Sequence, residues 1–311
     1  MFDHQRRSKY PPTSTTQVFR RTLDWRTNVV FASLLAASFC MGCRKGNEEI
    51  ESGPPRDLPD IVSAIQANAD RVDRPLWAGN VNVTARVKDD RGKRHSYNLE
   101  GSLLFDKPRN LRMDLRPGLG DQVMGLGSND QEYWVWIEPE MKAMHWGRHR
   151  YADQPCARST GIRVDQLVGA LGMGGLPSGS EGLSGPTRRE GKKHDILEYR
   201  RSGGVAVDRE YWVSRAPPYQ IHVVNFRDAQ RRIVMSAMLE DYEPAWQGGP
   251  LVPRAVSMIW PQEEGKFTMR VSRLKGMEPG KVAPTAFVRP DQAKLPKGVA
   301  EIIQVDADCG P

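Results

Sequence analysis

Four cysteines are the residues whose type and spacing could most readily do chemistry: Cys40, Cys43, Cys156 and Cys309. Cys40 and Cys43 have the CxxC spacing of zinc sites and thiol–disulfide oxidoreductases. A zinc site would need two further ligands, which the flanking residues do not supply, and a redox site would need a βαβ setting. The pair instead stands at the end of an apolar segment, so its spacing predicts neither a metal centre nor a redox centre.

The other candidate groups do not assemble a catalytic site. His145 and His149 are four positions apart, which suits a metal ion only on a helix, whereas the alternation of Met141–Trp146 predicts a strand. Glu138 and Glu140 flank a proline, which is typical of a solvated turn rather than of a glycosidase pair. The sequence contains no nucleophile elbow, P-loop, dinucleotide fingerprint or HExxH motif. We therefore predict no enzyme activity, no cofactor and no metal.

An apolar run of 13 residues, Val29–Met41, precedes Cys43 and follows a group of arginines. As a helix it would be about 20 Å long, which is shorter than the roughly 30 Å hydrocarbon core of a bilayer and fits a signal sequence. Gly42 and Cys43 at its end resemble the cleavage site of a lipoprotein signal, although Cys40 stands where such signals carry leucine. This predicts a signal segment over residues 1–43, lipid attachment at Cys43 and a tether over 44–57. A simple signal peptide and a buried helix of a cytosolic domain remain alternatives.

The positive charge of the chain is concentrated in this segment. The net charge is +7, from 45 basic and 38 acidic residues. Six of the basic and two of the acidic residues lie in 1–43, so residues 44–311 carry 39 basic and 36 acidic residues. A mature domain this close to neutral lacks the excess of basic residues that nucleic-acid binding requires, and we predict no nucleic-acid binding.

Beyond the tether, an amphipathic helix is expected over 58–72, and the hydrophobic period then changes to two. About twelve strand candidates follow in one meander, joined by short turns that favour antiparallel neighbours. A second helix is expected over Ile162–Met173, followed by a mobile Gly/Ser/Pro-rich loop, Gly174–Pro186. The strands are expected at 77–87, 99–105, 111–115, 122–126, 133–137, 141–146, 195–199, 209–213, 221–226, 233–239, 255–260 and 267–274.

A meander of this length exposes one apolar face and must curl to hide it. Two helices cannot cover so many strands, so an apolar concave cleft should remain, and such a cleft suits a hydrophobic ligand. From alternation alone, we expect the lining to be Val83, Leu103, Met113, Leu115 and Trp136.

The order of elements from 58 to 275 resembles the lipoprotein-carrier superfamily of LolA and LolB. An apolar strand, a basic residue with proline and an arginine-containing strand recur there in that order, as in LLFDKPRNLRMDLRP (103–117). The phrase DQEYWVWIEPEMKAMHWG (130–147) is similar to the hairpin that follows. The resemblance implies a mainly β fold with α-helices. It would be an incomplete antiparallel β-barrel of about 11–12 strands, with helices covering a hydrophobic concave face. Residues 276–311 lie outside the resemblance, and their many prolines and lysines predict a C-terminal tail.

The function implied by the resemblance is the non-catalytic binding of acyl chains of lipids or lipoproteins. The protein would be a monomer, lipid-anchored in the cell envelope and facing the periplasm, with the outer membrane favoured over the inner. Two alternatives remain: a scaffolding envelope lipoprotein whose barrel is filled by its own side chains, and an unrecognised hydrolase or sugar-binding protein. Outside the cytoplasm, Cys156 and Cys309 could form a disulfide or stay free thiols.

Overall fold

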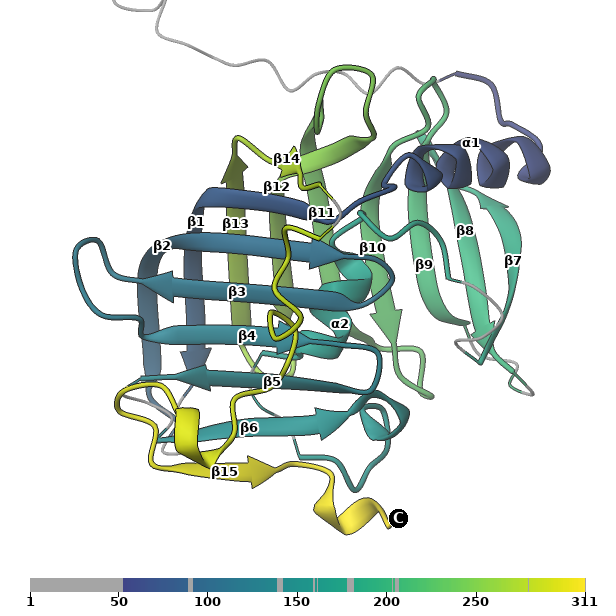
Figure 1. The fold of residues 1–311 in the computed structure, drawn as a ribbon. Coiled ribbons are helices and arrows are strands. Elements are labelled where there is room, and N and C mark those ends of the chain that lie inside the picture. Colours follow the sequence, from purple (N-terminus) through teal and green to yellow (C-terminus); the bar gives the residue numbers. More distant parts are fainter. Residues whose placement is uncertain are drawn as a thin grey trace, which may run out of the picture. The chain divides into compact units, whose positions relative to one another are not determined.

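The computed structural model divides the chain into Met1–Glu49 and Ile50–Pro311, and every residue that it describes lies in the second unit. The described residues are 53–88, 92–138, 142–158, 160, 162–177, 182–202, 204, 207–278 and 280–310 (Figure 1). The predicted signal segment, Cys43 and most of the tether lie outside them. Within these ranges, no helix is both long enough and apolar enough to pass through a bilayer.

The described strands form one open, 15-stranded sheet. Its path runs β15-β6-β5-β4-β3-β2-β1-β13-β12-β11-β10-β9-β8-β7, with β14 paired to β1 off the path. All neighbours are antiparallel except β15 and β6, and the two end strands, β15 and β7, do not pair with each other. The prediction of an incomplete antiparallel barrel is confirmed, with more strands than expected. The strands are β1 Leu76–Lys88, β2 Arg94–Asp106, β3 Asn110–Arg116, β4 Met124–Ser128, β5 Glu132–Ile137, β6 Ala143–Arg148, β7 Leu183–Glu190, β8 His194–Arg201, β9 Val207–Ser214, β10 Ile221–Arg227, β11 Ile233–Pro244, β12 Leu251–Trp260, β13 Gly265–Ser272, β14 Lys275–Gly276 and β15 Glu301–Gln304.

Alternation of side chains builds the core on one face of the sheet. In β1, the apolar side chains from Val81 to Val87 are buried at every second position, and the residues between them point to the other face. A register shift between Ala78 and Val81 bends β1. Gly79 lies at this bend, where a Cβ atom would stand 2.5 Å from the Trp77 ring. Glycine is therefore required at the point where the strand bends.

Helix α1 (Leu58–Asp70) begins after Asp57 and has Pro59 and the acidic Asp60 in its first turn. Both residue types are favoured at the start of a helix. Its buried side chains are Ile61, Ile65 and Ala69, so the expected helical face is confirmed. The Asn68 side chain attaches α1 to β12: its Nδ2 donates to the Leu251 carbonyl at 2.9 Å, and its Oδ1 accepts from the Leu251 N–H at 2.8 Å.

Helix α2 (Val164–Ala170) is shorter than predicted and lies against the core face of the sheet (Figure 1). It packs on β4 and β5. The side chain of its Gln166 accepts a hydrogen bond from Trp260 Nε1 on β12 at 2.9 Å, and both side chains are buried. The loop after α2 reaches β11, where a Cβ atom on Gly172 would stand 2.3 Å from Leu239. Helix α2 therefore joins strands that are far apart in the sheet.

The segment 276–311, predicted as a tail, returns to the sheet. Its β15 pairs with β6 in parallel, and its short 3₁₀ helices are η3 (Gln292–Lys294) and η4 (Ala307–Cys309). A disulfide joins Cys309 to Cys156, which follows the 3₁₀ turn η1 (His149–Tyr151). Of the two possibilities that the sequence left open, the structure has the bonded pair.

The prediction of a loop over Gly174–Pro186 is wrong from Leu183 onward, because β7 begins there. β7 is an end strand whose side chains, apart from Leu183, are half-buried or exposed, so it has no apolar alternation to recognise. Pro186 lies at a register shift between Ser184 and Thr187. A proline is compatible with an end strand at such an irregularity. Because prolines and the lack of alternation both argue against a strand, β7 is not predicted from the sequence.

Candidate functional site

The five predicted lining residues do not share one cavity. Val83, Leu103, Met113 and Leu115 belong to the main buried cluster, together with the apolar residues of α2, and none is more than 2% exposed. The concave face that they form is therefore closed by packing within the main buried cluster rather than open.

Trp136 requires a correction because it lies in a different cluster. It packs with Trp134, Met144 and Val299, and it approaches Gly125 so closely that a Cβ atom there would stand 2.3 Å from its Nε1. Neighbours of Trp136 along β5, such as Val135 and Ile137, belong to the main cluster instead. Alternation along β5 therefore turns Trp136 to the opposite face, where the C-terminal segment covers it.

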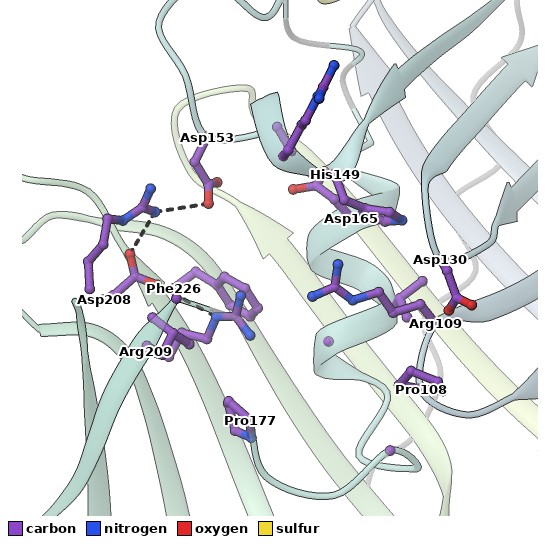
Figure 2. A pocket seen from close by; sticks show the side chains of 18 of the residues that line it. Pro108, Arg109, Asp130, His149, Asp153, Asp165, Pro177, Asp208, Arg209 and Phe226 are labelled. Carbon is purple, nitrogen blue, oxygen red and sulfur yellow. Dashed lines mark hydrogen bonds and ion pairs between the residues drawn. The ribbon is translucent and has the colours of Figure 1, made fainter. Parts of the chain in front are cut away.

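A cavity of about 1010 Å³ lies beside α2 (Figure 2). We call it the α2 cleft. One wall comes from α2 and the turns that follow β2, β4 and β6, and the other comes from β7 to β10 with the loop after α2. Its lining residues are Pro108, Arg109, Asp130, Gln131, Glu132, Trp146, Arg148, His149, Arg150, Ala152, Asp153, Gln154, Asp165, Val168, Gly169, Gly174, Gly175, Leu176, Pro177, Gly182, Leu183, Arg201, Ser202, Asp208, Arg209, Tyr211 and Phe226.

The inner wall of the α2 cleft is apolar. Val168, Leu183, Tyr211 and Phe226 line it from α2 and three different strands, and each is no more than 7% exposed. Gly169 on α2 keeps this wall open, because a Cβ atom there would stand 3.2 Å from Phe226 Cζ. The cleft therefore offers an apolar surface next to a position where the helix carries no side chain.

The rim of the α2 cleft is charged, and one ion-pair network joins its two walls. Asp153, in the turn after η1, lies 3.0 Å from Arg201 on β8 and 3.2 Å from Arg163 before α2. Arg163 also lies 2.8 Å from Asp165. On its own wall, Arg201 lies 3.0 Å from Asp208 (Figure 2). Arg201 and Asp153 are each about half exposed, so their attraction is weakened by solvent. The network links the walls without sealing the cleft.

His149 is the candidate acid–base group of the α2 cleft. Its Nε2 lies 2.9 Å from the Asn129 carbonyl oxygen and 3.1 Å from Ser128 Oγ. Burial, and then the positive charge of Arg109, lower the pKa of His149, so the imidazole is neutral at neutral pH. Ser128 is fully buried on β4, and a substrate could not reach its hydroxyl. This pair is therefore not arranged as a nucleophile and base.

Metal ligands do not gather anywhere in the part of the chain that the structure describes: no group of three or more His, Cys, Asp or Glu residues there could hold an ion. The strand predicted over Met141–Trp146 is observed as β6, which extends to Arg148. His145 is therefore on a strand, and His149 begins the following 3₁₀ turn. The two imidazoles do not share one helical face.

The apolar segments 123–126 and 167–176 do not protrude as loops. Both are largely buried, because the first runs into β4 and the second includes part of α2. The exposed apolar side chain in this region is that of Leu119, in the loop between β3 and β4.

The residues of the α2 cleft carry no signal in the sequence that marks them as a binding site. Arg109 lies in the turn between β2 and β3, and Asp130 in the turn between β4 and β5, where the sequence predicts only connections between strands. Arg209, Tyr211 and Phe226 belong to correctly expected strands, but nothing in their alternation distinguishes them from core residues. These residues come together only in the folded protein, at the point where α2 crosses the sheet.

No protein-family model and no curated protein sequence matches this chain. Solved structures with a similar fold include a domain from Vibrio parahaemolyticus described as an outer membrane lipoprotein-sorting protein domain, with 11% identity and a TM-score of 0.45, covering 75% of this chain and 97% of that one. A DUF1329 family protein from Desulfovibrio piger has 11% identity and a TM-score of 0.48, covering 78% and 100%. A LolA superfamily protein from Nitrosomonas europaea has 12% identity and a TM-score of 0.44, covering 73% and 97%. At such identities and TM-scores, the function must be argued from the geometry of this chain itself.

Proposed function

We propose that this protein is a non-catalytic acyl-chain-binding protein of the cell envelope, and that the α2 cleft is its binding site. The observation that carries the proposal is the apolar inner wall of the cleft beneath a charged rim. Such a surface suits an amphipathic ligand, whose chain lies along the wall while its polar end stays near solvent. Ligand pockets in proteins occupy about 300–1,000 Å³, and the α2 cleft, at about 1010 Å³, is large enough for an acyl chain of a lipid or lipoprotein.

A scaffolding role is the second candidate, and one observation favours it. The side chains of the concave face around Val83, Leu103, Met113 and Leu115 are buried within the main cluster. If the whole interior served only to stabilise the sheet, the α2 cleft would be a solvent-filled gap. A measurement of ligand binding at the cleft distinguishes the two functions, because only the first requires a ligand there.

Replacing Gly169 by leucine should reduce acyl-chain binding at least tenfold. The added side chain would enter the space next to Phe226, whereas the helix itself should tolerate it, since glycine is about 1 kcal/mol less favourable in a helix interior than alanine or leucine. The full chain is placed in nanodiscs of zwitterionic lipid and labelled with an uncharged photoactivatable monoacylglycerol, and labelling is quantified by mass spectrometry. Ala67→Leu adds the same kind of side chain to an exposed position of α1 and should leave labelling unchanged. Equal labelling of wild type and G169L would favour the scaffolding role.

We also propose that Cys43 carries a lipid that anchors the protein, facing the periplasm. The support is the apolar run of signal length that ends at Gly42 and Cys43. Cys43→Ala should leave the signal segment attached or release the protein into the soluble fraction, and intact mass spectrometry of membrane and soluble fractions distinguishes these states. A processed C43A protein that stays in the membrane at the wild-type level would contradict lipidation.

A further inference from the structure

The segment before α1 is held against one end of the sheet, where β8 begins and β9 ends. A Cβ atom on Gly53 would stand 3.0 Å from the carbonyl oxygen of Arg215, which follows β9. The backbone N–H of Arg56 donates to the Asp195 carboxylate, near the start of β8, at 3.3 Å. The chain that leads back to Cys43 therefore leaves the sheet beside the β7–β8 and β9–β10 turns.

Few residues separate this end of the sheet from the proposed lipid anchor. Nine residues lie between Cys43 and Gly53, and a chain of that length spans at most about 35 Å when fully extended. Strand β1, with 13 residues, is about 43 Å long. Because this reach is shorter than the sheet is long, a bilayer that holds the anchor can meet the end at Gly53 more readily than the opposite end.

Two exposed lysines, Lys192 and Lys193, lie in the β7–β8 turn at this end. The turn adjoins the start of the tether, because Arg215 Nη2 donates to the Gly191 carbonyl at 2.8 Å. Neither lysine forms an ion pair with a residue that the structure describes. Both ammonium groups are therefore available to a partner outside the chain.

The carboxylates on either side of this turn already have arginine partners. Glu190 lies 2.9 Å from Arg188. Asp195 is fully buried and lies 3.1 Å from Arg188 and 3.5 Å from Arg215. The exposed Asp57, before α1, carries one negative charge against the two lysines. This end of the sheet therefore keeps an excess of positive charge that faces solvent.

The β9–β10 turn beside the lysines is apolar. Pro217 and Pro218 are exposed, and Tyr219 is half-buried, with the Arg56 guanidinium over its ring at 5.9 Å from the centroid. Tyrosine is favoured at membrane–water interfaces, where its ring contacts lipid and its hydroxyl contacts water. Basic side chains next to such a ring are attracted to anionic lipid headgroups. The two turns together therefore have the chemistry of a membrane-contacting surface.

We propose that the turns 190–194 and 215–220 dock on a bilayer that contains anionic lipid, with Lys192 and Lys193 at the lipid phosphates. We call these two turns the anchor-side surface. The proposal rests on the proposed lipid at Cys43, which brings this surface to the bilayer, and it does not depend on ligand binding in the α2 cleft.

The same docking fixes the direction in which the α2 cleft faces. Arg201, Asp208 and Phe226, which line the cleft, lie at the other ends of β8, β9 and β10 from the anchor-side surface. The distance along β9 from Asp208 to Arg215 is about 23 Å. The docked protein therefore holds the cleft away from its own membrane, on the side from which a ligand in transit would arrive.

Hydrogen–deuterium exchange of the full chain in nanodiscs tests the anchor-side surface. Intact mass spectrometry first identifies the form that carries a lipid on Cys43. The nanodiscs contain phosphatidylcholine alone or mixed with phosphatidylglycerol. In the mixed nanodiscs, backbone amides of 190–194 should exchange at least about threefold more slowly than in phosphatidylcholine, and high salt should abolish the difference. The β4–β5 turn, at the cleft, should exchange equally in both.

A double variant, Lys192→Gln with Lys193→Gln, should lose most of this slowing. The matched control, Lys266→Gln with Lys294→Gln, removes two exposed lysines from the start of β13 and from η3, and should keep it. Full slowing in the first double variant would overturn the assignment of the two lysines. Equal exchange of the lipid-carrying wild type in both nanodiscs would overturn the docking surface and leave the anchor intact. Absence of a lipid on Cys43 would overturn both.

Discussion

Replacing Cys309 by serine is expected to lower the free energy of unfolding by about 2–5 kcal/mol. The disulfide with Cys156 closes a loop across a sequence separation of 153 residues, and a cross-link over so long a loop restricts the unfolded chain strongly. In the folded state it fastens η4 to the turn after η1, next to the Arg158 N–H that donates to the Val305 carbonyl at 2.9 Å. Loss of this bond should free the end of the segment that pairs with β6.

Urea unfolding of the full chain, followed by tryptophan fluorescence, measures this effect. Trp134 and Trp136 lie beneath the C-terminal segment and should report its detachment. Cys156→Ser and the reduced wild type should show the same loss as C309S. Asp308→Ala removes only an exposed ion pair with Arg158 in the same segment and should cost less than about 1 kcal/mol. A C309S protein as stable as the oxidised wild type would show that the cross-link does not stabilise this sheet edge.

Asp195→Ala is expected to destabilise the protein by about 3–5 kcal/mol, because it leaves the buried guanidinium group of Arg215 without its counter-charge. Asp195 is fully buried on β8 and accepts a hydrogen bond from Arg188 Nε at 3.1 Å, and Arg215 Nε lies 3.5 Å away. Arg215 is 9% exposed and cannot regain solvent easily. The Asp195 carboxylate also accepts from the Arg56 backbone N–H at 3.3 Å, so it holds the segment before α1 against the sheet.

The matched control for D195A is Asp121→Ala. Asp121 pairs with Lys297 at 2.7 Å, but both side chains are more than two thirds exposed, so its loss should cost less than about 1 kcal/mol in the same urea titration. Asp195→Asn keeps the shape and one oxygen acceptor, and should be less destabilising than D195A. Similar losses for D195A and D121A would contradict the role of burial.

The strands and α1 could be predicted because their information is local. Val81 to Val87 alternate with polar residues, and the helix around Ile61 and Ile65 shows a clear apolar face. β7 could not be predicted, since an end strand with one buried side chain carries no period. Neither could the pairing of β15 with β6, because a short segment such as Glu301–Gln304 does not reveal its partner.

The site was harder to predict than the fold because its position depends on how α2 packs against the sheet. Alternation correctly marks Leu103 and Met113 as inward-facing, but it does not reveal that packing within the main cluster closes the space in front of them. The same rule, applied across strands without a known register, placed Trp136 on the wrong face. The α2 cleft combines turn residues such as Arg109 with strand residues about a hundred positions later, such as Arg209, and only the folded sheet brings them together.

The most direct test of acyl-chain binding in the α2 cleft is the position of the photoactivatable monoacylglycerol after cross-linking. The full chain in nanodiscs is labelled and digested, and modified residues are identified by tandem mass spectrometry, with G169L processed in parallel. We predict adducts on residues of α2, β9 and β10 around Gly169, Tyr211 and Phe226 in the wild type, and their loss in G169L. Adducts confined to the outer face, for example at the exposed Met238 and Ile259, or unchanged in G169L, would contradict a binding site in the cleft.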